Sequence, residues 1–228
     1  MKLLVFFVSA LISVHALDVP TLSLSASATI WKPSDELQLK IGVVTLGVSA
    51  QEALAENSSK MRGVIQNLEV IGLSGDDYET SNFSINPTYT PCPKDPPPSW
   101  RQTINGYEVT NTILIRTPKL DLAGSIIDSA NKAGANSITD IRFGLRHARD
   151  HWSEALTQAG LNAVSDAQAI ARATGVRLVR VRSITLNSTQ VHSPQLNLAG
   201  MAKCAQSTPI EPGEVSITAN VTLLYEID

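Results

Sequence analysis

Three side chains in the middle of the chain have the types and spacing of a metal site. His147 and His151 are four residues apart, so on a helix they would share one face, and Glu154 would follow one turn later. Imidazole and carboxylate groups arranged in this way bind zinc. The competing interpretation is that Asp150 caps a helix and that the histidines are solvated side chains beside the cap. This second interpretation is the stronger, and we predict no metal site and no cofactor.

The two cysteines, Cys92 and Cys204, are the other candidates for chemistry. Neither belongs to a Cys-x-x-Cys pair, so thiol redox chemistry of the oxidoreductase kind is not expected. In an oxidising compartment the two thiols could form a disulfide across a long loop, which would stabilise the chain by up to about 4.7 kcal/mol. A disulfide within the chain, a disulfide between chains and free thiols all stay open, because the sequence cannot show how closely the two residues approach.

Several activities lack their usual sequence support. The chain has no Gly-x-Gly-x-x-Gly, no Gly-Lys-Ser/Thr phosphate loop and no Gly-x-Ser-x-Gly elbow. Its 18 basic and 21 acidic residues give a net charge of −3, which argues against a nucleic-acid partner. Residues 140–182 hold seven arginines that could serve an anionic ligand, but four acidic residues in the same stretch favour a solvated face: Asp140, Asp150, Glu154 and Asp166. We therefore predict a protein that is not an enzyme and has no catalytic residues.

The first residues have the form of a secretory signal peptide. Lys2 precedes an apolar stretch from Leu3 to Val14, and Val14-His15-Ala16 offers a plausible cleavage site. The stretch is shorter than the roughly 20 residues of a membrane-spanning helix. We expect cleavage after Ala16, a periplasmic or otherwise exported mature chain of residues 17–228, and no integral membrane segment after cleavage.

Hydrophobic periodicity predicts the elements that position these side chains. Alternating apolar residues indicate strands at 21–30, 37–43, 78–89, 106–116, 138–145, 176–186 and 215–227. Helices are expected from the cap Ser49 to Gly72, from the cap Asp121 to Gly134, and from Asp150 to Thr174. The third helix carries an alanine at every fourth position from Ala155 to Ala171, a smooth stripe that lets another element approach closely. Hairpins outnumber strand-helix-strand units, the first two strands being one of them, so we predict one compact α+β domain with a mainly antiparallel or mixed sheet.

Two segments interrupt the periodic pattern. Residues 91–98 are rich in proline and cannot join a sheet ladder, so they are expected to form a stiff exposed loop or protrusion. Pro96, Pro97 and the neighbouring Trp100 are candidate interface residues, since exposed aromatic side chains often anchor interfaces. The second segment, from Asn187 to Glu214, is too long for a tight hairpin and is expected to be a functional or disordered loop.

Several stretches together resemble the SIMPL-domain family, whose bacterial members are exported proteins described as periplasmic immunogenic or oxidative-stress-defence proteins. No single piece is specific, but the set occurs in order over nearly the whole mature chain. The matching pieces are the strand at 21–30, the helix start at 50–57, Pro87-Thr88-Tyr89, and the stretches at 104–109, 126–130, 134–138 and 163–175 with Val179 and Ile184.

The resemblance implies an α+β fold and, for some members, large ring-like or channel-like oligomers; it transfers no catalytic residue. The chain departs from the family pattern at Cys92 with its proline-rich insertion, and at Arg177-Leu178-Val179-Arg180, where a Leu-Gly pair is usual. The leading hypothesis is a non-enzymatic cell-envelope protein that self-associates and supports envelope or oxidative-stress tolerance. The alternative is a monomeric periplasmic or secreted binding module that uses the 187–214 loop and the basic stretch.

Overall fold

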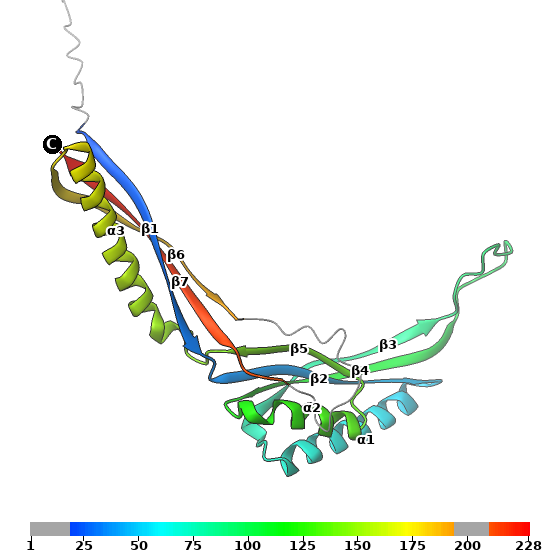
Figure 1. The fold of residues 1–228 in the computed structure, drawn as a ribbon. Helices are drawn as coiled ribbons and strands as arrows, with labels where there is room; N and C mark the ends of the chain where they lie inside the picture. The colour runs from blue at the N-terminus through cyan, green and yellow to red at the C-terminus, as the bar shows by residue number, and fades with distance from the viewer. Residues whose placement is uncertain (1–18, 194–209) are drawn as a thin grey trace, which may run out of the picture. The chain divides into compact units, whose positions relative to one another are not determined.

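The computed structural model describes residues 19–193 and 210–228, which form three α-helices and seven β-strands (Figure 1). In chain order the elements are β1 (Thr21–Pro33), β2 (Glu36–Gly47), α1 (Ala50–Val70), β3 (Tyr78–Tyr89), β4 (Ile104–Thr117), α2 (Ala123–Lys132), β5 (Ser137–Gly144), α3 (Trp152–Thr174), β6 (Leu178–His192) and β7 (Glu214–Ile227). The predicted α+β class is confirmed. None of the helices in these residues is long and apolar enough to cross a membrane.

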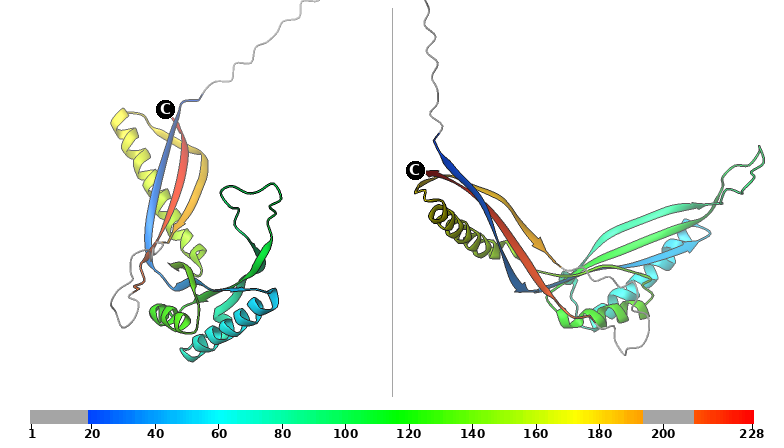
Figure 2. Two further views of the ribbon diagram at one scale, coloured as in Figure 1. Left: turned by 90° about the vertical axis from the view of Figure 1, so that its right-hand side faces the viewer. Right: turned by 45° about the horizontal axis from the view of Figure 1, so that its top comes forward.

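The strands form two separate sheets (Figure 2). One has three strands in the order β1-β7-β6, and the other has four in the order β3-β4-β2-β5. The predicted hairpin of the first two strands is therefore wrong, because β1 and β2 belong to different sheets. Alternation identifies a half-buried strand but does not specify which strand pairs with it.

The chain also divides into two compact units. Of the described residues, 19–28, 156–188 and 219–228 make up the first, here the α3 unit, and 29–155, 189–193 and 210–218 make up the second, here the α1–α2 unit. Each unit buries its own apolar side chains.

The core of the α1–α2 unit lies between its two helices and one face of the four-stranded sheet. The sheet is antiparallel throughout, with Leu39 of β2 opposite Ile115 of β4. Alternate residues of β2, from Leu37 to Val43, are fully buried against apolar residues of α1 and α2. This is the arrangement expected for a sheet with one face on the core.

Helix α1 begins and ends where its sequence predicts. The Ser49 hydroxyl accepts a hydrogen bond from the Glu52 N–H at 3.2 Å, and Gly72 follows the helix with φ of +103°, a conformation that glycine adopts without strain. On the buried face, the Asn57 amide donates to the carbonyls of Val43 (2.8 Å) and Val109 (3.0 Å). This side chain fastens the helix to two neighbouring strands.

Three other boundaries differ from prediction. Asp121 lies within a short 3-10 turn, Leu120–Leu122, and provides no side-chain cap for α2, which begins at Ala123. A second 3-10 turn, Ala148–His151, contains Asp150, so α3 starts only at Trp152. The chain makes a tight turn before each helix, and the acidic residue falls inside that turn. Strand β6 continues to His192, so the first residues of the predicted 187–214 loop are strand; residues 194–209 lie outside the described part.

In the α3 unit, helix α3 crosses one face of the three-stranded sheet (Figure 2). Its alanine stripe is buried, with Ala159, Ala163 and Ala167 fully inaccessible. Small side chains allow this close approach, and the Asn162 amide adds a hydrogen bond to the Ser27 carbonyl at 2.9 Å. The predicted role of the alanines as a contact surface is thus confirmed.

Candidate interaction surfaces

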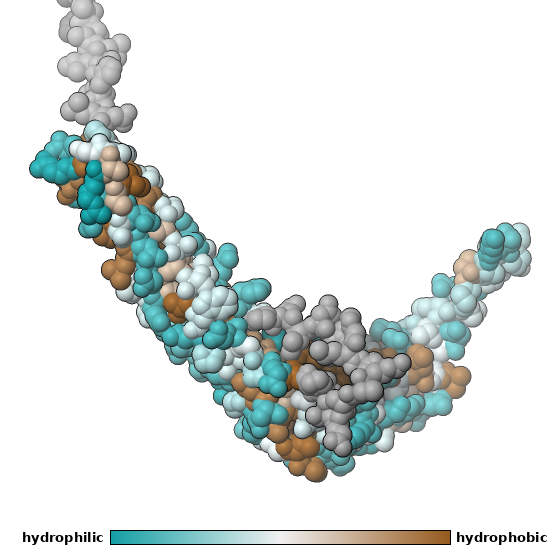
Figure 3. Space-filling model, in the orientation of Figure 1, coloured by the Kyte–Doolittle hydropathy of each residue, from teal (hydrophilic) through white to brown (hydrophobic). Residues whose placement is uncertain are grey.

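The free edge of the three-stranded sheet carries an exposed apolar strip. Strand β6 is an edge strand, and four of its apolar side chains are between 41% and 64% exposed; we call them the β6 strip: Val179, Val181, Ile184 and Leu186. The space-filling view shows hydrophobic residues scattered over the visible surface of the molecule (Figure 3). An edge strand with exposed apolar side chains is a template for further strand pairing.

Contacts of the polar β6 residues show which face of the sheet the strip occupies. Arg180 Nε lies 2.9 Å from the Glu226 carboxylate, and Asn187 donates to the Thr222 hydroxyl at 2.8 Å. Thr222 also bonds Ser25, so these groups share the polar face of the sheet. Alternation then places Val179, Val181 and Leu186, which are next to these polar residues, on the opposite face, the one that α3 crosses. Helix α3 and the sheet bury the apolar residues of β7, including Val221 and Leu223, but leave those of β6 uncovered.

A second strip lies on the β3–β4 hairpin of the α1–α2 unit. Its residues, the β3 strip, are between 38% and 51% exposed: Phe83, Ile85, Tyr89 and Ile104. Ile85 stands opposite the buried Val109, and Tyr89 stands opposite Ile104. The strip therefore continues the core face of the sheet along β3, the edge strand.

The proline-rich loop joins the two strands of this hairpin. Pro96 and Pro97 are exposed, whereas Trp100 is half-buried and its backbone N–H donates to the Pro97 carbonyl at 2.8 Å. The loop is exposed outside the ladder, as the sequence predicts. An interface role for these residues stays a prediction. Cys92, in the same loop, is exposed, but its pairing with Cys204 lies outside the described residues.

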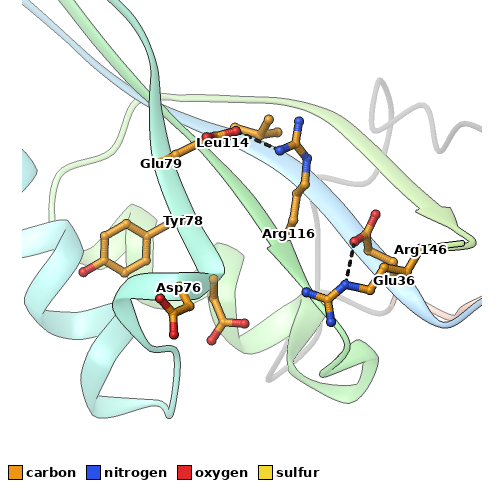
Figure 4. Close-up of a pocket in the computed structure, with 8 residues that line it drawn as sticks. Glu36, Asp76, Tyr78, Glu79, Leu114, Arg116 and Arg146 are labelled. Carbon is orange, nitrogen blue, oxygen red and sulfur yellow. Dashed lines mark hydrogen bonds and ion pairs between the residues drawn. The ribbon is translucent and has the colours of Figure 1, made fainter.

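A small polar cavity opens beside the start of β3 (Figure 4). It has a volume of about 240 Å³ and is lined by Glu36, Asp76, Asp77, Tyr78, Glu79, Leu114, Arg116 and Arg146. Arg116 pairs with Glu79 at 2.8 Å, and Arg146 approaches Glu36 at 3.8 Å. No serine, cysteine or histidine is among the lining residues, so the cavity can hold a polar ligand but offers no nucleophile paired with an imidazole base. Sequence reasoning missed this cavity, since its residues come from separate elements and share no local pattern.

Asp77 gives this cavity a measurable pH dependence. Burial acts to raise the pKa of its carboxyl group, but hydrogen bonds from the Ser74 N–H (2.8 Å) and hydroxyl (2.9 Å) outweigh that effect. With further hydrogen bonds from Thr117 and Lys119, the pKa of Asp77 lies below its ordinary value. A carboxyl group with a lowered folded-state pKa stabilises the fold above its unfolded pKa of about 3.9, and this contribution is lost as pH falls through the folded pKa.

We expect Asp77→Asn to lower the free energy of unfolding at pH 7, and the difference from the wild type to shrink as the pH falls below about 4. Urea denaturation at a series of pH values measures this. The neighbouring Asp76→Asn, at an exposed position, is the control and should change stability little. A deficit of Asp77→Asn that stays constant from pH 7 to pH 3 would contradict the assignment.

The candidate metal ligands do not form a site. His147 precedes the 3-10 turn and His151 ends it, while Glu154 forms an ion pair with Lys32 at 2.7 Å. Within residues 19–193 and 210–228, no three His, Cys, Asp or Glu side chains are grouped to hold a metal ion.

Trp152 is half-buried, and the Arg149 guanidinium lies 5.0 Å from the centre of its ring.

The arginines of residues 140–182 have partners that the sequence did not indicate. Arg180 and Arg182 both approach Glu226 of β7. Arg177, which precedes β6, pairs with Asp228, which follows β7. Two of the acidic residues expected to balance them pair with lysines instead, Asp140 with Lys40 and Glu154 with Lys32. Strand pairing between distant segments sets these partners, so a count of charges along residues 140–182 cannot predict them.

Comparison with known proteins places this chain in a family. The SIMPL family model, described as a protein of unknown function (DUF541), matches residues 22–225. The 26 kDa periplasmic immunogenic protein of Brucella melitensis is 29% identical over 194 residues, which cover 83% of this chain and 77% of that protein. The uncharacterized protein YggE of Escherichia coli K12 is 22% identical over 214 residues, covering 92% and 85%. YggE of Edwardsiella ictaluri is 24% identical over 200 residues, covering 86% and 82%.

The name of the Brucella protein agrees with the predicted location, periplasmic or otherwise exported. The family match spans both units and almost all of the chain after the predicted signal peptide. The chain belongs to the SIMPL family.

Proposed function

We propose that this chain is a non-enzymatic, exported cell-envelope protein that assembles from several copies into a ring-like or channel-like oligomer and supports envelope or oxidative-stress tolerance. The observation that carries the proposal is the pair of open sheet edges, β6 and β3, each with an exposed apolar strip. Contiguous exposed apolar surface is uncommon on a monomer and usually marks an interaction site. Assembly is also what the family resemblance implies for some members.

The non-enzymatic part of the proposal is supported by the chemistry of the described residues. The cavity in Figure 4 pairs its arginines with carboxylates rather than presenting a nucleophile beside a base. The one motif with metal-site spacing has its carboxylate engaged with Lys32. The stress-tolerance part rests on the resemblance, and it predicts that cells lacking the protein survive peroxide less well than cells that produce it.

The solution mass of residues 17–228 tests assembly. We expect size exclusion with light scattering to give a defined mass of several chains. The same measurement with a reductant tests Cys92: a mass that drops under reductant would make the cysteines intermolecular, whereas an unchanged mass would leave the strips as the contacts. A single-chain mass in both buffers would contradict the proposal.

One observation favours the alternative of a monomeric binding module. The cavity beside β3 carries both carboxylates and guanidinium groups, so it suits a small ligand with charges of both signs. A single-chain mass in the experiment above would favour this function over assembly.

A further inference from the structure

The two apolar strips have the same pattern along their strands. In β3, Thr80 and then Phe83 and Ile85 lie on the core face of the sheet, because the register shifts between Thr80 and Asn82. Arg180, Arg182 and Asn187 all contact the same face of β7, which implies a one-residue irregularity in β6 somewhere between Arg182 and Asn187. If it precedes Ile184, then Ile184 and Leu186 share the face of Val179 and Val181. A bulge of this kind shifts the alternation by one residue. After the bulge, even-numbered side chains lie on the face that odd-numbered side chains occupy before it.

One alignment of β3 beside β6 therefore keeps every apolar residue on one face. Placed in parallel with Phe83 beside Ile184, β3 also sets Ile85 beside Leu186 and Thr80 beside Val181. With the β6 irregularity placed before Ile184, the irregularities of the two strands coincide. In an antiparallel alignment of the same residues, the two irregularities would lie at opposite ends of the paired segment. The apolar residues of the two strands would then change faces at different points.

The charges of the two strands are complementary. Strand β3 contains one acidic residue, Glu79, and no lysine or arginine, whereas β6 contains two arginines, Arg180 and Arg182, and no acidic residue. Within the chain, Glu79 pairs with Arg116 and Arg180 pairs with Glu226. The parallel alignment places Glu79 beside Arg180, and both side chains are well exposed. Pairing β6 with a second β6, or β3 with a second β3, would instead bring like charges together. Such complementarity selects the partner and suppresses the wrong pairing.

We propose that copies of this chain join head to tail, with β3 of one copy adding in parallel to the β6 edge of the next. This inference rests on the proposed self-assembly and names its contact. Because the contact uses two different surfaces, each added copy leaves one β3 edge and one β6 edge free. Such a contact builds a ring if the rotation closes and a filament if it does not.

A mixing experiment with two variants of residues 17–228 tests the contact. Ile184→Asp with Leu186→Asp disrupts the β6 strip, and Phe83→Asp with Ile85→Asp disrupts the β3 strip. All four positions are exposed, so each variant is expected to fold, which circular dichroism checks. Leu161→Asp, at an exposed leucine of α3, is the matched control and should keep the wild-type mass.

We expect each variant alone to have the mass of one chain, and an equal mixture to have the mass of two chains and no more. In the mixture, the intact β3 of one variant meets the intact β6 of the other, and growth stops there. Any dimer formed by one variant alone, any variant that keeps the wild-type mass, or a mixture that stays at one chain would overturn the head-to-tail contact. A single-chain wild type would instead overturn the proposed assembly itself, so the two failures are distinguishable.

Charge reversal provides a second test if either double variant fails to fold. Glu79→Arg or Arg180→Glu alone should weaken assembly by roughly 2- to 5-fold, as expected for an exposed ion pair, and the two together should restore it. Light scattering over a concentration series measures the midpoint of assembly. Two single variants that weaken assembly with no recovery in the double variant would contradict the alignment.

Discussion

Replacing Leu39 by alanine is expected to lower the free energy of unfolding of the α1–α2 unit by about 2–5 kcal/mol. Leu39 is fully buried in β2 opposite Ile115, and truncation removes buried methyl groups and leaves a cavity that the close-packed core fills only in part. Hydrogen exchange followed by mass spectrometry measures the effect within each unit, which a single melting curve of a two-unit chain would not resolve.

The same strand supplies a matched control. Leu46 is 64% exposed near the other end of β2, so Leu46→Ala changes the same side chain without emptying a buried site. We expect a change within about 0.5 kcal/mol. Equal effects of the two substitutions would mean that β2 does not bury the face assigned to it.

The second large effect is expected from Ala163→Asp in the alanine stripe of α3. Ala163 is fully buried between the helix and its sheet, and a carboxylate there would have neither room nor a partner. We expect a loss of roughly 3 kcal/mol or more, confined to the α3 unit, because burial of an unpaired charge is among the costliest substitutions. Hydrogen exchange should increase across α3 and its sheet while amides around Leu39 stay protected.

Ala169→Asp controls for helix propensity, because it makes the same change at an exposed position of the same helix. Only the intrinsic preference of the helix for alanine over aspartate, about 0.7 kcal/mol, is lost there. If both variants lost stability equally, the stripe would not be a packing surface.

Local patterns in the sequence predicted most elements but not their partners. Ser49 and Gly72 mark the ends of α1 because capping and a positive φ depend on residues within one turn. The pairing of β1 with β7 rather than β2 depends on tertiary packing between residues about 190 positions apart, such as the Thr29 and Thr218 hydroxyls at 2.8 Å. Periodicity within a single strand carries no information about such a pairing.

The candidate surfaces, like the fold, were predictable from local sequence patterns but not where they depend on tertiary packing. The proline run identified the exposed loop, since proline cannot join a ladder. The alternation of Phe83 and Ile85 indicated a strand face, but their exposure depends on how far α1 covers the sheet. The charged cavity of Figure 4 gave no sequence signal, because Glu36 and Arg146 meet only after β2 and β5 pair.

The burial of Asn57 has a consequence for producing the protein. Asn57-Ser58-Ser59 is an acceptor sequence for N-linked glycosylation in cells that modify secreted chains. The sugar would be attached to the same amide nitrogen that donates to the Val43 and Val109 carbonyls, at a position with no solvent access. A glycan added there before folding would keep α1 from its sheet. A eukaryotic secretory host would therefore yield folded protein only from chains left unmodified at Asn57, whereas a host without N-glycosylation avoids this competition.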